Sequence, residues 1–272
     1  MKPGGLACRR RGFALVAVLW LVAALSVLVA GMSMSLRVDL ALAHSDRQLA
    51  AGAALGDGAI ALAVAGLLAR DDRPQELLRR RYQVDGNTVE VEIVPVTGLV
   101  DLSGASPLLL ERLLVDAGGL TEAIAGSAIR RLLARQEMWK DDPDALYHTL
   151  LNDPAIDASL HDTLSRLITF HPAGVEGINP RAAPHEVLLL LAGNDAARQD
   201  STPDLAAWAP QLITTEITSV YRIEARVAAD RGSYVVRTRW IDIGQRSHSG
   251  LPWATLRVEP ARLIKVADDV GA

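Results

Sequence analysis

Cysteine is almost absent from this chain of 272 residues, because Cys8 is the only one. The rest of the sequence therefore lacks the thiol groups needed for a disulfide, for thiolate catalysis and for thiolate metal ligands. Chains without cysteine occur in reducing and in oxidising compartments, so this absence does not indicate the compartment.

Recognisable catalytic motifs are also lacking. The sequence has no Gly-x-Ser-x-Gly nucleophile motif, no phosphate-binding glycine loop and no His-Glu-x-x-His zinc motif. The six histidines are scattered along the chain: His44, His148, His161, His171, His185 and His248. We therefore expect a protein that is not an enzyme.

Excess positive charge occurs only at the N-terminus. Residues 1–12 contain Lys2, Arg9, Arg10 and Arg11 and no acidic residue. Of the 28 Lys and Arg residues, 24 remain for the rest of the chain, against 32 Asp and Glu, so the rest carries a net charge of −8. A basic start before an acidic body indicates orientation at a membrane rather than nucleic-acid binding.

Charge is then missing from the 24 residues 13–36. This apolar run is too long for the 7–15-residue core of a cleaved signal peptide, and it exceeds the ~20 residues that cross a bilayer as a helix. A retained transmembrane anchor is therefore favoured over a cleaved signal. The basic start would stay in the cytoplasm, which places the body outside the inner membrane of a bacterium.

Apolar residues at helical spacing and abundant alanine continue the helix, which we predict from Phe13 to Ala69. Ser26 is expected to bond back to this helix. The close spacing of Gly52 and Gly56 suits either a helix of another subunit in a filament or this chain's own sheet. Pro74 ends the helix, and a short basic helix is expected directly after it.

The remaining segments predict an α+β protein with strands at both ends of its body. Asp85-Gly86 marks a hairpin whose second strand buries alternate residues. A second hairpin turns at residues 230–232, and a last strand covers 253–259. Between these strand groups, residues 102–215 are predicted to be helical, with Ser106 as a helix cap and Pro107 as the first helical residue.

The junction between Gly12 and Phe13 resembles the end of the prepilin leader of type IV pilins and type II secretion pseudopilins. In that family, a prepilin peptidase cuts after the glycine and methylates the new N-terminal residue. The resemblance implies cleavage between Gly12 and Phe13, with Phe13 N-methylated. The apolar helix would serve first as an anchor and then as an assembly element.

The family usually carries Glu at the fifth mature position, where this chain has Ala17. In lacking that Glu, the chain resembles the minor pseudopilin K family (general secretion pathway protein K), whose members are placed at the filament tip. A Glu there would have no subunit above it to pair with, and an unpaired charge in hydrocarbon is costly.

A second resemblance to the K group lies in two segments that precede Leu-rich helices, "LVDLSGASPLLLERLL" and "GINPRAAPHEVLLLL". The first has Asp101 and Ser103 where Asn is common, and the second keeps Ile178 and Asn179. We expect Asn179 to close a turn over its own backbone, which is a structural role.

The second segment also resembles a helix-hairpin-helix DNA-binding unit. However, the region from Asp101 to Thr215 holds 16 acids against 8 bases, a field that opposes phosphate. We therefore expect no nucleic-acid partner.

Two acidic clusters lie in the same region. Some K-type members bind calcium, so the resemblance leaves calcium open, but the clusters fit helix caps better than ligand sets, and we assign no metal site. Their residues are Asp141, Asp142, Asp144, Asn152, Asp153, Asp157 and Asp162.

Taken together, these resemblances imply a pilin-like α+β fold with a long N-terminal helix packed on an antiparallel sheet. The expected parts are a prepilin leader (1–12), a transmembrane and assembly helix (13–36), a pilin-like first half (37–101), an inserted α-helical domain (102–215) and closing strands (216–272).

The implied protein is a minor pseudopilin that initiates and caps a secretion pseudopilus for the export of folded proteins. It would be a single-pass inner-membrane protein with its globular part in the periplasm, and other minor pseudopilins and the prepilin peptidase would be its partners. The alternative is a membrane-anchored periplasmic binding module or enzyme with an uncleaved anchor.

Overall fold

The computed structural model describes residues 11–70, 72–136, 145, 148–150, 152, 156, 158–169, 177–192, 210–247 and 250–265. Within these ranges, the side chains of residues 11–15, 27–41, 136, 158–159, 162, 210, 231 and 265 lie outside the description. The chain divides into two compact units, Met1–Ala51 and Gly52–Ala272, which are considered separately below.

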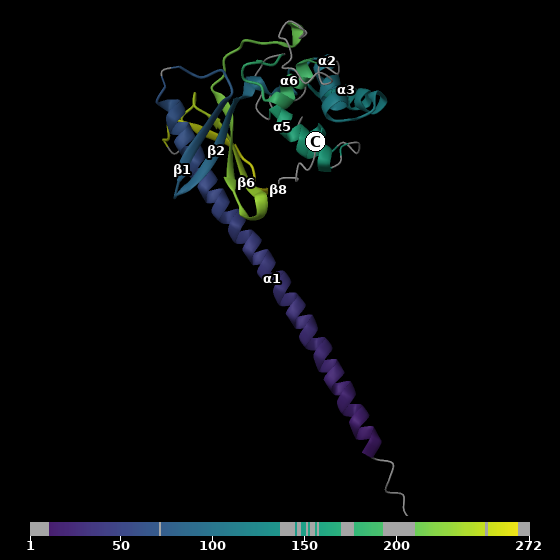
Figure 1. The fold of residues 1–272 in the computed structure, drawn as a ribbon. Helices are drawn as coiled ribbons and strands as arrows, with labels where there is room; N and C mark the ends of the chain where they lie inside the picture. Colours follow the sequence, from purple (N-terminus) through teal and green to yellow (C-terminus); the bar gives the residue numbers. More distant parts are fainter. Residues whose placement is uncertain are drawn as a thin grey trace, which may run out of the picture. The chain divides into compact units, whose positions relative to one another are not determined.

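One uninterrupted helix, α1 (Arg11–Leu68), begins in the first unit and ends in the second (Figure 1). Its bounds agree with the predicted 13–69 to within two residues. Ser26 Oγ donates to the Val22 carbonyl at 2.8 Å, as expected for a hydroxyl that bonds back to its own helix.

The helix expected after Pro74 is wrong, because the residues concerned start a strand. Strand β1 (Leu78–Val84) pairs with β2 (Asn87–Pro95). Arg79 and Arg81 of β1 face Glu92 and Glu90 of β2, with N–O distances of 2.8 Å. Arg and Leu favour helices, but intrinsic propensity is a small effect that pairing with a neighbouring strand overrides here.

The predicted turn of this hairpin is confirmed. Asp85 and Gly86 have φ angles of 48° and 74°, so both central residues are left-handed. This is the conformation of the two-residue turn whose twist matches that of the strands. As predicted, Val89, Val91 and Ile93 of β2 are buried, and Val94 and Pro95 at the end of the strand are buried as well.

The second predicted hairpin is also present. Strand β5 (Val220–Ala228) and strand β6 (Ser233–Asp242) flank a short 3-10 turn, η5 (Asp230–Gly232). Two short strands pair with β6: β7 (Ala254–Val258), which was predicted, and β8 (Arg262–Lys265), which was not. The described strands of this main sheet pair antiparallel, in the order β1-β2-β5-β6-β7, with β8 also on β6.

Helices occupy the sequence between β2 and β5, although these two strands are neighbours in the sheet. The elements of this region are the turn η1 (Val96–Gly98), α2 (Pro107–Arg112), the π-helical turn η2 (Leu113–Ala117), α3 (Glu122–Gln136), α5 (Ala158–Leu167), α6 (His185–Ala192) and the turn η4 (Pro210–Leu212). Two-residue strands β3 (Val100–Asp101) and β4 (Ile168–Thr169) form a parallel pair that the sequence did not predict. The fold is therefore α+β, with an antiparallel main sheet.

The predicted start of α2 is correct. Ser106 Oγ accepts a hydrogen bond from the Leu109 N–H at 3.3 Å, and Pro107 is the first helical residue.

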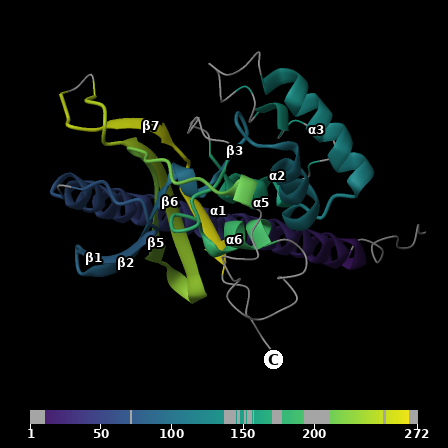
Figure 2. The same cartoon turned by 90° about the horizontal axis from the view of Figure 1, so that it is seen from above.

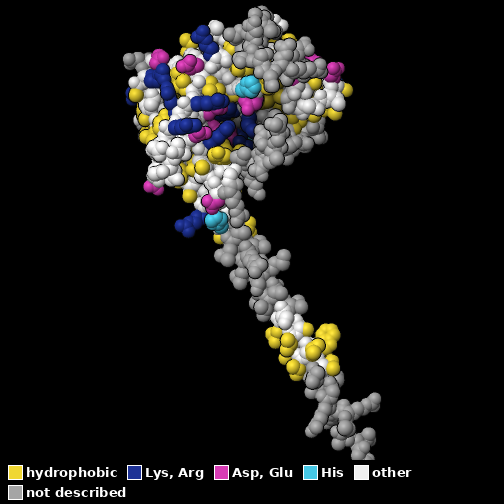
Figure 3. Space-filling view, viewed as in Figure 1, with side chains coloured by type: hydrophobic (Ala, Val, Ile, Leu, Met, Phe, Trp, Pro, Cys, Tyr) yellow, Lys and Arg dark blue, Asp and Glu magenta, His cyan; other side chains and the backbone are white. Residues whose placement is uncertain are grey.

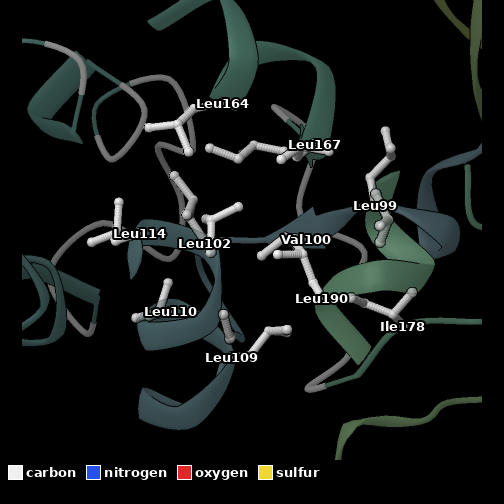
Figure 4. Packing of buried hydrophobic residues seen from close by; sticks show 14 of the residues in the cluster. Leu99, Val100, Leu102, Leu109, Leu110, Leu114, Leu164, Leu167, Ile178 and Leu190 are labelled. Carbon is white, nitrogen blue, oxygen red and sulfur yellow. The ribbon is translucent and has the colours of Figure 1, made fainter. Parts of the chain in front are cut away.

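The two faces of the sheet are covered by different elements (Figures 1 and 2). Tyr221, Ile223 and Ala225 share one face of β5, and Gly56 of α1 lies against Ala225. Val94, Val220 and Trp240 belong instead to a hydrophobic core that includes the helices between β2 and β5. Leucines from α2, η2, α5 and α6 converge in that core (Figure 4).

Candidate functional site

The expected processing junction lies at the N-terminal end of α1. The backbone of Gly12 and Phe13 is helical, their side chains lie outside the described residues, and so does the leader up to residue 10. Ala17, where the family usually has Glu, is exposed. The large apolar side chains that follow it are exposed as well, with Trp20 at 73%. A helix whose described side chains are apolar and exposed is typical of contact with lipid or with other helices.

One helical stretch is long and apolar enough to cross a membrane, among the residues whose side chains are described: Leu42–Leu68. The C-terminal part of this stretch packs on the sheet, and its residues Ile60, Val64 and Leu67 are buried. A shorter apolar helical stretch covers Val16–Ser26. It lies inside the predicted span of 13–36, of which the remaining side chains are outside the description.

The glycines in the second part of α1 allow the helix to approach the sheet closely. A Cβ atom added to Gly52 would lie 2.6 Å from the Cβ of Val235, and one added to Gly56 would lie 2.8 Å from the Cβ of Arg237. Such distances are shorter than van der Waals contact. Of the two alternatives for these glycines, packing on the chain's own sheet is therefore the one observed.

Asp57 joins α1 to β6 by charge. Its Oδ1 atom lies 2.8 Å from Nε of Arg237, and its Oδ2 atom lies 2.8 Å from Nη2 of Arg239. Arg237 also donates to the Glu259 carbonyl at 2.6 Å. Burial alone would raise the pKa of Asp57, but the hydrogen bonds and charges of the two arginines outweigh it and lower the pKa below its ordinary value of 3.8.

The two segments that precede Leu-rich helices have matching turns. Asp101 Oδ1 accepts hydrogen bonds from the Ser103 N–H at 2.8 Å and from its hydroxyl at 2.6 Å. Asn179 Oδ1 accepts from the Arg181 N–H at 3.1 Å, as expected for a turn closed by Asn. In addition, Asn179 Nδ2 donates to the Gln75 carbonyl at 3.0 Å, so this buried amide connects the helical region to the segment before β1.

No group of three or more His, Cys, Asp or Glu side chains is arranged for a metal ion in the part of the chain that the structure describes. Asp141, Asp142, Asp144, Asp153 and Asp157 lie outside that part, as does the side chain of Asp162. Asn152 is exposed.

Two adjoining cavities of about 560 and 350 Å³ lie over the sheet face opposite α1. They share the lining residues Glu92, Glu186, Glu224 and Arg226. Basic and acidic side chains also lie interleaved on the face of the globular part seen in Figure 3. The larger cavity adds Arg79 and Arg81 of β1, and the smaller adds Arg222 of β5 together with residues of η2, α5 and α6.

Sequence reasoning missed the Asp57 contacts and the Arg222 cavity. A signal for the first was present, because Asp57 is an isolated acid in an apolar helix and so requires a partner. The alternation of Arg222, Glu224 and Arg226 along β5 gave a misleading signal. It predicts a solvent-facing side, whereas Arg222 and Glu224 are only 6% and 8% exposed beneath the helical region.

Comparison of the sequence with protein-family models and with curated proteins found no match.

Proposed function

We propose that this chain is a minor pseudopilin of a type II secretion system, of the K type, which acts at the tip of the pseudopilus. The observation that carries the proposal is helix α1. It is one uninterrupted helix that begins at the junction between the basic leader and Phe13, has exposed apolar residues in Val16–Ser26, and packs on an antiparallel sheet from Gly52 onwards. A helix that first anchors the protein in the membrane and later packs against other subunits in a filament needs these three properties.

In this proposal, cleavage between Gly12 and Phe13 leaves Phe13 as the N-methylated first residue. Ala17 then occupies the position of the usual Glu. A subunit with no neighbour above it has no N-terminus with which a Glu would pair, and a charge at the centre of a bilayer costs about 2.5–3.5 kcal/mol on insertion scales. Ala17 therefore suits a subunit that is placed first.

The helical region between β2 and β5 would be the inserted α-helical domain of a pilin-like fold, at about residues 102–215. The pairing of β2 with β5 supports this assignment. Two strands that are neighbours in the sheet but are separated in the sequence by a long helical segment are typical of an inserted domain. The bulk of this domain would prevent another subunit from stacking above the tip.

The protein would thus help to initiate and cap the pseudopilus, which exports folded proteins across the outer membrane. Its globular part would lie in the periplasm, its partners would be the other minor pseudopilins, and the prepilin peptidase would process it at the inner membrane. The alternative, an anchored binding module or enzyme, would retain its leader.

The experiment that tests the proposal is mass analysis of the N-terminus of membrane-extracted protein. The expected mature chain begins at N-methylated Phe13. Gly12→Leu should block maturation, and Gly5→Leu, which changes a leader glycine away from the junction, should leave it intact. An unprocessed Met1 in the native protein, or cleavage beyond Leu36, would reject the pseudopilin proposal in favour of the alternative.

A further inference from the structure

Arg222 of β5 has an unusual environment. It lies opposite Val94 of β2 and Trp240 of β6 in the sheet, and both of these neighbours belong to the hydrophobic core shared with the helices. Arg222 is only 6% exposed, yet it lines the cavity of about 350 Å³. A cationic side chain is therefore held at the boundary between a hydrophobic core and an open space.

The hydrogen bonds of this guanidinium are incomplete. One terminal nitrogen, Nη1, donates to the carbonyl of Arg166. The Nε atom is buried and makes no hydrogen bond. Among the described residues, no carboxylate forms an ion pair with Arg222. The neighbouring arginines differ, because Arg226 pairs with Glu224 and Arg79 pairs with Glu92.

A buried cation without a carboxylate is unfavourable for folding, since its lost hydration is not replaced by an ion pair. Arginine offers a planar fork of donors whose geometry matches a carboxylate. The smaller cavity also has a volume within the range typical of small-ligand sites. The missing partner of Arg222 would therefore be supplied from outside the chain.

The rest of the lining indicates what carries this carboxylate. Leu167 and Leu190 are buried in the wall, and Leu189, Pro184 and Ala117 complete its apolar part. The charged lining comprises four carboxylates against three arginines, so a ligand with several negative charges would be repelled. These residues are Glu92, Asp116, Glu186 and Glu224, and Arg166, Arg222 and Arg226. A single negative charge on an aliphatic body satisfies both conditions.

We propose that this cavity binds a monocarboxylate with an aliphatic body, which Arg222 holds by its carboxylate and the leucines hold by its alkyl part. The proposal does not depend on the pseudopilin assignment. Two sources share this chemistry: the C-terminal residue of a peptide and a free aliphatic acid. N-acetyl-L-leucine represents the first, and 4-methylpentanoate represents the second.

Isothermal titration of the full chain in detergent tests the proposal. At least one of the two probes should bind, and the tighter of the two identifies the source. N-acetyl-L-leucinamide has the aliphatic side chain but no carboxylate, and inorganic phosphate has negative charge but no aliphatic part. Neither of these two compounds should bind. Failure of both carboxylates to bind, or equal binding of the amide, would overturn the proposal.

Arg222→Met should weaken binding of the carboxylate probe at least about tenfold, because the charged hydrogen bonds are lost. Arg222→Lys should retain part of the affinity, and Arg70→Met, which removes an exposed arginine outside the lining, should retain all of it.

A stability measurement separates a binding role from a structural one. Arg222→Met should melt at or above the temperature of the unchanged protein, since replacing a buried unpaired charge by an apolar side chain is neutral or stabilising. Undiminished binding by Arg222→Met would overturn the proposal. A clearly lower melting temperature of this variant would show that Arg222 has a structural role instead.

Discussion

At the scale of single residues, Asp57 of α1 forms ion pairs with two arginines of the sheet. Two arginines of β6 share its carboxylate, and each is less than one-third exposed. Such an arrangement stabilises the fold more than an isolated surface pair does, because water screens it less.

We predict that Asp57→Asn lowers the free energy of unfolding by about 1–2 kcal/mol, since two charge-assisted contacts become neutral ones. Urea denaturation of the full chain in detergent measures this change. Asp72→Asn is the matched control, because Asp72 is exposed and pairs with the exposed Arg70, so it should change little.

The same contacts predict a pH dependence. The pKa of Asp57 is lower in the folded protein than its ordinary value of 3.8. Its contribution to stability is therefore complete above that value and is lost as the pH falls towards the lowered pKa. Melting temperatures between pH 7 and pH 3 should consequently fall less in Asp57→Asn than in the unchanged protein. An equal fall in both would contradict this role.

At the scale of elements, the contact between α1 and β6 depends on the absence of side chains. We predict that Gly52→Ala destabilises the protein despite the higher helix propensity of alanine, because the new methyl group would meet Val235 at 2.6 Å. Gly66→Ala is the matched control. Its Cβ would have Tyr82 at 3.8 Å as its nearest neighbour, so it should stabilise the helix by up to about 1 kcal/mol.

Melting temperatures of the two alanine variants test this pair of predictions. Gly52→Ala should lie below the unchanged protein, and Gly66→Ala should lie at or above it. Stabilisation by both substitutions would mean that the helix does not approach β6 as closely as described.

Elements with strong local signals could be predicted from the sequence, and those determined by distant partners could not. The turn at Asp85-Gly86, the cap at Ser106 and the length of α1 each follow from adjacent residues. The start of β1, up to residue 80, was expected to be helical, because its ion pair between Arg79 and Glu92 depends on another strand. The parallel pair of β3 and β4 likewise joins segments far apart in sequence.

The candidate sites show the same division. The Gly12-Phe13 junction and Ala17 are sequence patterns that need no structure to be noticed. The cavity at Arg222 requires β2, β5 and three segments of the helical region to come together, and no local pattern along β5 distinguishes a covered arginine from an exposed one.

At the scale of the globular unit, helices and sheet share one core. We predict that Leu110→Ala, a truncation in α2 of a fully buried side chain, lowers the stability of the sheet as well as of the helices, by about 2–5 kcal/mol. Hydrogen exchange followed by mass spectrometry in increasing urea measures the two regions separately. Amides of α2 and of β5 should lose protection together.

Leu62→Ala is the control, because Leu62 is 47% exposed on α1 and its truncation should change stability by less than about 0.5 kcal/mol. Early loss of protection in α2 and α3 while β2, β5 and β6 remain protected would show instead that the helical region unfolds independently.

The pairing of β2 with β5 has a consequence for how the chain is made. Strand β2 ends at Pro95, and its neighbour starts only at Val220. One side of the first hairpin therefore stays without its hydrogen-bonding partner while the whole helical region is synthesised, and an unpaired strand edge promotes association between copies of a chain. A chain interrupted before Val220 would leave the edge of β2 permanently unpaired. The C-terminal strands therefore protect the N-terminal hairpin from associating with the same hairpin of another copy.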